Sequence, residues 1–240
     1  MHLHIIIHES FEAPAAIEQR AIQKQLLITY TRLYQGDKFP ENIKDIDFLI
    51  IMWWPQSPAT TTTECPHFSA QKEALFIKDI IDTGKLVVGI CLGAQMIGEA
   101  LWASFAHSPN REIGVFDVTL TETAKNDPFF VDFPSAFPVG HRHGDMPWLT
   151  ETAVVLATSE GCPRQIVRYL PNVYGFQCHF EFTPPAIEGM IANSSDELES
   201  YKDLTYIRSA QQLRNYDYIP INNLLFIFLD YMETVHNQKK

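Results

Sequence analysis

Short apolar runs alternate with amphipathic segments along the first hundred residues. The runs are rich in β-branched residues and end at polar or small residues, which is typical of buried parallel strands. The longer segments carry apolar residues at helical spacing, as at Ile77, Ile80 and Ile81, and Gly84 follows as a C-cap. The pattern predicts strands at residues 3–8, 47–52 and 85–90 and helices at residues 15–33, 68–83 and 92–104.

The middle of the chain has a different pattern. Four short strand candidates there are separated by turn residues, which favours antiparallel additions to the sheet. A helix can begin at Pro184, residues 194–203 are polar and predict an exposed connection, and residues 204–236 have a helical pattern. The strand candidates are residues 115–121, 154–158, 165–169 and 173–178.

This order of elements predicts an α/β fold in three layers, with a mostly parallel central sheet and helices on both faces. We find no internal repeat and no linker in the sequence. We therefore expect one domain over residues 1–240, with a core of about residues 1–190 and a C-terminal helical extension of about residues 200–240.

Composition narrows the class of protein. The chain has 240 residues, 46% of them hydrophobic, which is ordinary for a globular protein. With 18 Lys and Arg against 29 Asp and Glu, its formal charge of −11 argues against binding to nucleic acid or to anionic membrane lipid. The four cysteines form no C-x-x-C pair, and the N-terminus lacks the features of a signal peptide. We expect a cytoplasmic protein that has no membrane span.

The clearest chemical motif is Gly89-Ile90-Cys91-Leu92-Gly93, where a predicted strand meets a predicted helix. Small residues on either side of a nucleophile are typical of a nucleophile elbow. The helix N-terminus would favour the Cys91 thiolate, and the Leu92 backbone N–H would offer one oxyanion donor. The alternative is a small apolar cysteine packed at the end of a strand.

A second motif, Gln177-Cys178-His179-Phe180-Glu181, follows a strand candidate and precedes Thr183-Pro184. Side chains two residues apart on an extended backbone face the same side. His179 could therefore take a proton from a thiol while Glu181 orients its ring. A surface His/Glu pair is the alternative reading of this motif alone.

Together, residues 89–95 and 179–184 resemble the class I glutamine amidotransferase family. Within that family, the chain more closely resembles the stand-alone proteins similar to the amidotransferase domain of GMP synthase. Glu112-Ile113-Gly114 and His143-Gly144-Asp145 also resemble family segments. The resemblance implies a flavodoxin-like fold in which Cys91, His179 and Glu181 form a catalytic triad. It implies that Gln95 and His143 lie at the substrate, that a γ-glutamyl thioester forms, and that no cofactor is needed.

The chain departs from the family pattern after the strand at residues 47–52. The family usually has Gly-Gly-Pro there, and this loop supplies the second oxyanion donor; here the residues are Trp53-Trp54-Pro55. Tryptophan does not readily adopt the positive φ open to glycine. The backbone of Trp54 is the matching donor, and its loss would leave hydrolysis weak, altered in substrate or absent. The alternative function is therefore a catalytically impaired binding or regulatory subunit. The other alternative is that the loop packs differently and another N–H takes its place.

Other features of the sequence concern metal binding, protein partners and a redox alternative. His141 and His143 alternate along a strand-like segment but lack a recognisable third ligand, so we predict no metal site. The chain has no phosphate-binding G-x-x-x-x-G-K-[ST] loop. A protein that activates an ammonia acceptor would have to bind in trans, and self-association into a homo-oligomer is left open. A cysteine-based redox protein is a weaker alternative, because a redox thiol needs no His-x-Glu partner.

Overall fold

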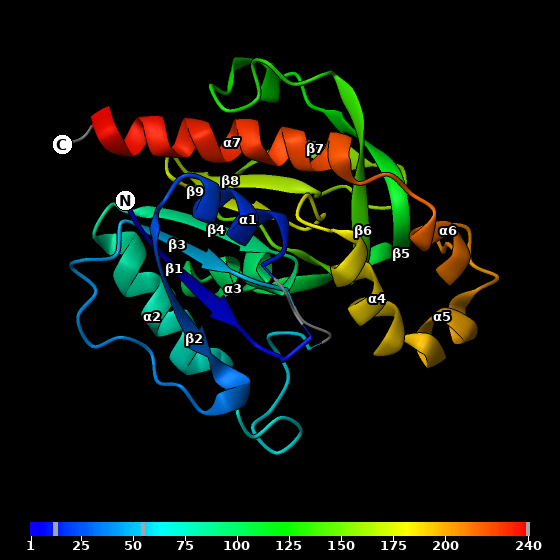
Figure 1. Ribbon diagram of the computed structural model, residues 1–240, viewed down its shortest axis with the longest axis horizontal. Coiled ribbons are helices and arrows are strands. Elements are labelled where there is room, and N and C mark those ends of the chain that lie inside the picture. The colour runs from blue at the N-terminus through cyan, green and yellow to red at the C-terminus, as the bar shows by residue number, and fades with distance from the viewer. Residues whose placement is uncertain (12–13, 54–55, 239–240) are drawn as a thin grey trace.

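The computed structural model describes residues 1–11, 14–53 and 56–238. Its centre is a nine-stranded sheet in the order β2-β1-β3-β4-β9-β8-β7-β5-β6 (Figure 1). The strands are β1 (His2–Ile7), β2 (Leu27–Arg32), β3 (Phe48–Ile51), β4 (Leu86–Ile90), β5 (Phe105–Leu120), β6 (Ala136–Pro147), β7 (Val154–Ser159), β8 (Ile166–Leu170) and β9 (Val173–Phe176).

Five neighbouring strands of this sheet, from β2 to β9, run parallel. The remaining four, β8, β7, β5 and β6, are added antiparallel. The predicted mostly parallel sheet with antiparallel additions is confirmed. The parallel part carries the candidate chemistry, because the carboxyl ends of parallel strands open onto one edge of a sheet.

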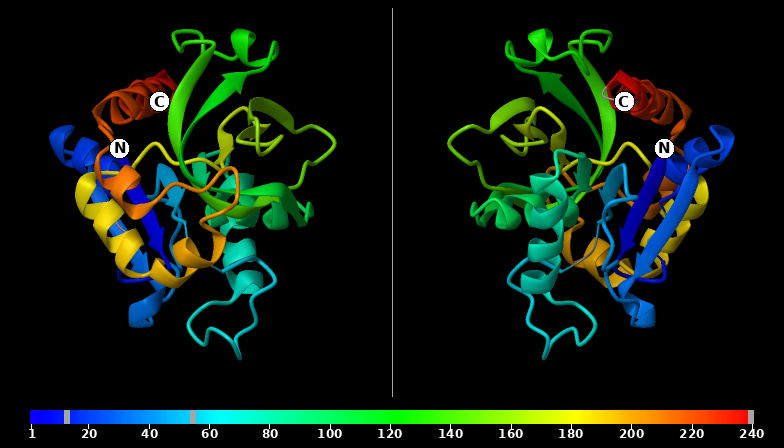
Figure 2. Two further views of the ribbon diagram at one scale, coloured as in Figure 1. Left: turned by 90° about the vertical axis from the view of Figure 1, so that its right-hand side faces the viewer. Right: turned by 90° about the vertical axis from the view of Figure 1, so that its left-hand side faces the viewer.

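The helices cover both faces of the parallel part, and side chains alternate between two apolar cores. On one face, Ile5, Ile50 and Val88 pack in a core with residues of α1 and α7. On the other face, Ile6, Leu49 and Val87 pack with α2 and α3. Figure 2 shows α7 and α2 on opposite sides of the sheet. The helices are α1 (Ala16–Gln23), α2 (Ala70–Asp82), α3 (Leu92–Ala100), α4 (Pro184–Ala192), α5 (Ser195–Tyr201), α6 (Ala210–Arg214) and α7 (Ile219–Gln238).

The helix predicted for residues 15–33 is wrong in its second half. Helix α1 ends at Gln23, Gln25 adopts a positive φ of 54°, and β2 then pairs parallel with β1. Leu27-Ile28-Thr29-Tyr30-Thr31 is rich in β-branched residues, and its pairing with β1 outweighs the helical pattern before it. The predicted helix at 92–104 is also too long, since α3 ends at Ala100.

The C-terminal part of the chain differs in detail from the prediction. The polar stretch predicted as a connection contains helix α5, and the segment predicted as helical over residues 204–236 divides into α6 and α7. Helix α7 crosses the sheet and buries Leu225 and Phe228 in the core. No helix among the described residues is long and apolar enough to span a membrane.

Candidate active site

Cys91 lies at the turn between β4 and α3, at the carboxyl edge of the parallel strands. Its φ of 52° and ψ of −106° are unusual for a residue with a side chain, and strained backbone of this kind clusters at functional sites. The Cys91 backbone N–H donates to the carbonyl of Phe176, the last residue of β9, at 2.6 Å. The elbow is therefore fixed against the neighbouring strand.

The two glycines of this motif permit the tight turn. A Cβ atom on Gly89 would collide with the backbone of Gly93, and one on Gly93 would collide with the backbone of Ile51 in β3. Helix α3 thus lies too close to β4 and β3 for any larger side chain at either position. This packing holds Cys91 at the N-cap position of α3.

The Cys91 thiol is buried and hydrogen-bonded. Gln177 Nε2 donates to Sγ at 3.3 Å, and Sγ–H donates to the Arg142 carbonyl oxygen at 3.5 Å. Burial raises the pKa of the Cys91 thiol to about 12, although Arg142 and the Leu92 N–H act in the opposite direction. The sequence led us to expect a thiolate. That expectation is wrong for this state, because desolvation outweighs the helix N-terminus and the thiol stays neutral.

His179 and Glu181 form a fully buried pair just beyond β9. His179 Nδ1 lies 2.7 Å from Glu181 Oε1, and both side chains are 0% exposed. Backbone bonds in both directions between His179 and Gly140 of β6 hold this segment to the sheet. A proton on Nδ1, donated to the carboxylate, leaves the lone pair on Nε2, where a base needs it.

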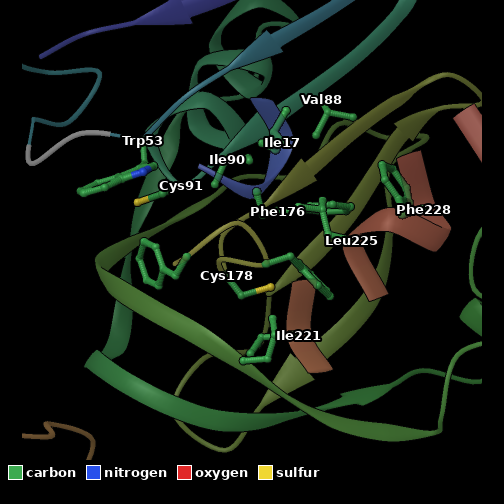
Figure 3. Close-up of a cluster of buried hydrophobic side chains, with 14 of the residues drawn as sticks. Ile17, Trp53, Val88, Ile90, Cys91, Phe176, Cys178, Ile221, Leu225 and Phe228 are labelled. Carbon is green, nitrogen blue, oxygen red and sulfur yellow. The ribbon is translucent and has the colours of Figure 1, made fainter. Parts of the chain in front are cut away.

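His179 Nε2 has no hydrogen-bond partner among the described residues. Within the described structure, Cys91 Sγ bonds to Gln177 and to the Arg142 carbonyl, and it forms no hydrogen bond with His179 Nε2. The Trp53 indole connects the two: its ring lies edge-on to His179 at 5.5 Å between centroids, and Figure 3 shows it beside Cys91. The Phe182 ring stacks on the His179 ring, with 4.3 Å between their centroids.

Trp53 is buried, with 1% exposure, and is not among the described residues with positive φ. Its Nε1–H is buried without a partner in the described part of the chain. In Figure 3 the nitrogen side of the ring lies toward Cys91. An unpaired buried donor costs about 1–3 kcal/mol, so this N–H calls for an explanation. Trp54, the predicted backbone donor, lies outside the described residues.

A pocket of about 100 Å³ opens onto the thiol. The predicted substrate residues Gln95 and His143 both line it. Gln95 Nε2 donates to Gln177 at 3.0 Å, which leaves Gln95 Oε1 buried and unpaired in the described structure. The other lining residues are mostly charged or polar: Gln56, Arg111, Arg142, Gly144, Asp145 and Glu197.

His143 is held by Glu112, whose Oε2 lies 3.1 Å from His143 Nε2. Burial lowers the pKa of His143, despite this carboxylate, so the imidazole is neutral. His141 also lies near Glu112, at 3.6 Å. Glu112 therefore brings two of the motifs found in the sequence, Glu112-Ile113-Gly114 and His143-Gly144-Asp145, into contact beside the pocket.

Three residues important to this geometry were given no role by the sequence analysis. Gln177 is the first residue of the second motif and contacts both Gln95 and Cys91. Arg142 reaches Ser194 and Glu197 from β6. Asn222 of α7 donates to the carbonyls of Phe180 and Phe182, at 2.7 and 3.0 Å, on either side of Glu181. The Asn222-Asn223 pair at the start of an otherwise apolar run was a usable signal for a buried amide.

Comparison with known proteins agrees with this fold. The family model for glutamine amidotransferase class-I matches residues 6–195. The glutamine amidotransferase-like protein YfeJ of Salmonella typhimurium is 45% identical over 239 residues, which cover 100% of both chains. GMP synthase of Thermosipho africanus is 32% identical over 116 residues, which are 47% of this chain and 22% of that protein.

Solved structures match over almost the whole chain. The crystal structure of SMU.1228c superposes with a TM-score of 0.95 at 43% identity, covering 97% of this chain and 100% of that one. A glutamine amidotransferase from Thermotoga maritima superposes at 0.85 with 24% identity, covering 97% of each, and shows the shared fold. The chain belongs to the class I glutamine amidotransferase family, and its fold is the flavodoxin-like α/β sandwich expected from the sequence.

Proposed function

We propose that this protein is a cysteine-dependent amide hydrolase that releases ammonia from glutamine or a related γ-glutamyl amide. The buried His179–Glu181 pair carries the proposal, since Gln177, two residues before His179, donates to the thiol of the strained Cys91 elbow. A pair that merely sits on the surface would be exposed, whereas both of these side chains are 0% exposed and His179 Nε2 has no partner in the described structure. We also propose that residues 1–240 act as one domain, since Asn222 of α7 binds the backbone around Glu181.

The reaction uses the neutral thiol as its starting point. When substrate fills the pocket, His179 Nε2 takes the Sγ proton and Sγ attacks the side-chain amide carbonyl. The C–N bond then breaks, His179 returns the proton to the leaving nitrogen, and ammonia departs from a γ-glutamyl thioester. Water attacks the thioester with His179 as base, which releases glutamate and restores the thiol. Catalytic hydrogen bonds that are open without substrate commonly form in the complex.

Two donors would stabilise the oxyanion of each tetrahedral intermediate. One is the backbone N–H of Leu92, which already acts on the Cys91 sulfur. We propose the Trp53 Nε1–H as the second, because it is buried, lacks a partner in the described structure and lies on the Cys91 side. A side chain would then take the role of the family's glycine loop. The backbone of Trp54 remains the alternative donor.

The pocket suits a small charged substrate. Its volume of about 100 Å³ admits one amino-acid side chain and is below the ~300 Å³ of ordinary drug-sized pockets. Gln95 Oε1, buried and without a partner among the described residues, is an acceptor for the amide N–H₂ of the substrate. His143 would line the same site as a neutral side chain.

Released ammonia needs an acceptor if this activity serves biosynthesis. The resemblance to part of GMP synthase supports a protein partner in trans that activates the acceptor. A cytoplasmic setting remains our expectation from the sequence. The formal charge of −11 favours a partner with a basic surface. A homo-oligomer is compatible with the same arrangement.

A binding or regulatory subunit is the second candidate function. Trp53 favours it, because its indole occupies the neighbourhood where the family has glycine. The raised pKa of the Cys91 thiol also favours a binding or regulatory role, since a neutral buried thiol is a poor nucleophile without a base.

Ammonia release separates the two functions. Wild type should release ammonia from glutamine or from a member of a γ-glutamyl amide panel, and Cys91→Ala should not. Cys162→Ala is the matched control for loss of a buried thiol away from the pocket. Equal background release by wild type and Cys91→Ala on every substrate would reject hydrolysis and leave the binding function.

A further inference from the structure

A second group of cysteine, histidine and carboxylate side chains lies outside the candidate active site. Glu9 follows β1, and Cys65 and His67 lie on the loop between β3 and α2. Their candidate ligand atoms all lie within 4.8 Å of one another. His67 Nε2 is 3.4 Å from Cys65 Sγ and 2.5 Å from Glu9 Oε1.

We propose that Glu9, Cys65 and His67 form a binding site for a zinc-like divalent transition metal. Thiolate, imidazole and carboxylate are the donors that Zn²⁺ takes in proteins, and three of them leave a fourth position for water. At zinc bond lengths of about 2.0–2.3 Å, tetrahedral ligand atoms lie about 3.3–3.8 Å apart. The distance between Cys65 Sγ and His67 Nε2 already falls in this range. The Glu9 carboxylate must move roughly 1 Å away from His67 Nε2 to reach it.

Solvent can reach this cluster, which distinguishes it from the chain's other candidate. The side chains of Glu9 and His67 are 18% and 30% exposed, so a metal ion has a path of entry. The trio of Glu112, His141 and His143 is at most 1% exposed. Its carboxylate already accepts from Ser159 and Gln165 as well. Burial and existing bonds therefore favour the cluster at Cys65.

The backbone around the cluster is fixed by buried contacts. His8, next to Glu9, lies 3.1 Å from the buried Glu73 of α2. His8 also packs edge-on against Phe68, the neighbour of His67, at 5.8 Å between centroids. These contacts hold the two chain segments together whether or not a metal is bound, so the ligands are largely positioned in advance.

Gln56 connects this cluster to the candidate active site. Its Nε2 donates to Cys65 Sγ at 3.2 Å, a bond that stabilises a metal-bound thiolate. Gln56 also lines the pocket that contains Cys91. A bound metal would thus fix the loop at the edge of the pocket. The proposal itself stands apart from the proposed hydrolysis, because it concerns binding alone.

Cobalt binding tests the site, since Co²⁺ takes zinc positions and reports a thiolate ligand by a charge-transfer absorption band. The full chain carrying Cys91→Ala is used, so that neither turnover nor the active-site thiol contributes. One Co²⁺ per chain should give the band, and Zn²⁺ should displace it. The band should disappear in Cys65→Ser and in His67→Gln. It should persist in the controls Cys162→Ser and Glu112→Gln. Zn²⁺ should raise Tm only where the band forms.

Several outcomes would overturn the site. The site is rejected if the Cys91→Ala chain gives no band or if the band persists in Cys65→Ser. It is also rejected if the band is lost only in Glu112→Gln, which would place the metal in the buried trio. Because His67 is partly exposed, His67→Gln keeps the test valid if Cys65→Ser folds poorly. Gln56→Leu should weaken the affinity by about tenfold, the lower end for a residue that supports a metal ligand.

Discussion

His179 Nδ1 and Glu181 Oε1 lie 2.7 Å apart with both side chains fully buried, although only Phe180 separates them in the chain. The chain bends at Phe180 between the two residues, and the backbone bonds between His179 and Gly140 keep this segment in place. The carboxylate fixes the imidazole tautomer that leaves Nε2 available as a base.

Glu181→Gln removes the negative charge and keeps the shape of the side chain. We expect kcat for amide hydrolysis to fall by about 10²–10⁴-fold, the range for a general base that loses its function. Steady-state kinetics on the best substrate measure this. Glu188→Gln is the control, because Glu188 is an exposed carboxylate paired with Arg214 and should change kcat little. Equal rates for the two variants would remove Glu181 from the mechanism.

Cys91 should react selectively with electrophiles shaped like glutamine. All four cysteines are buried, and burial raises the pKa of Cys91 to about 12, so a small neutral alkylating reagent should label each of them slowly near pH 7. A glutamine-like chloroketone can fill the pocket and bring His179 into use. Peptide mass spectrometry should find the label on Cys91 first. Uniform labelling of the four thiols would contradict the proposed pocket.

Trp53→Phe keeps an aromatic ring and removes the Nε1–H. If this N–H stabilises the oxyanion, kcat should fall by about 10²–10³-fold with little change in KM. Replacing Trp53-Trp54 by Gly-Gly distinguishes the alternative. The replacement should raise the rate if the indoles merely obstruct the site. An unchanged rate in Trp53→Phe would rule out the indole donor.

Asn222→Ala breaks two hydrogen bonds between α7 and the segment that carries His179 and Glu181. We expect a loss of about 1–3 kcal/mol in the free energy of unfolding, because two buried carbonyls lose their donor. Urea unfolding measures it, and kcat should fall as well. Asn223→Ala, an exposed neighbour on the same helix, is the control. Equal stability of both variants would show that α7 does not support the site.

Stability at alkaline pH should depend on Cys91. Its folded pKa of about 12 lies above the ordinary thiol value of 9.0, so the folded state keeps a proton that the unfolded chain loses. The contribution of this proton to the free energy of unfolding is fully present below pH 9. It is lost between about pH 9 and 12, with a slope of up to roughly 1.4 kcal/mol per pH unit. Urea unfolding at pH 8 and pH 10.5 should show a smaller decline for Cys91→Ala than for wild type. Parallel declines would mean that the thiol is not desolvated.

Local signals made much of the fold predictable. The runs at β1, β3 and β4 are continuous and apolar, since parallel strands are buried on both faces. Residues 27–32 were misassigned because a short edge strand differs little from the end of an amphipathic helix. Its pairing with β1 is a contact between segments far apart in the chain, and the pattern of either segment alone does not contain it.

The sequence alone determined most of the elements, the class of fold and the two motifs, because strand periodicity, glycine at a tight turn and the i, i+2 spacing act over a few residues. Tertiary structure decided the protonation of Cys91, the buried position of Trp53, the support from Asn222 and the meeting of Glu9 with Cys65 and His67. Each of these depends on desolvation or on contacts between distant segments, and both exist only once the sheet and its two helical layers have packed.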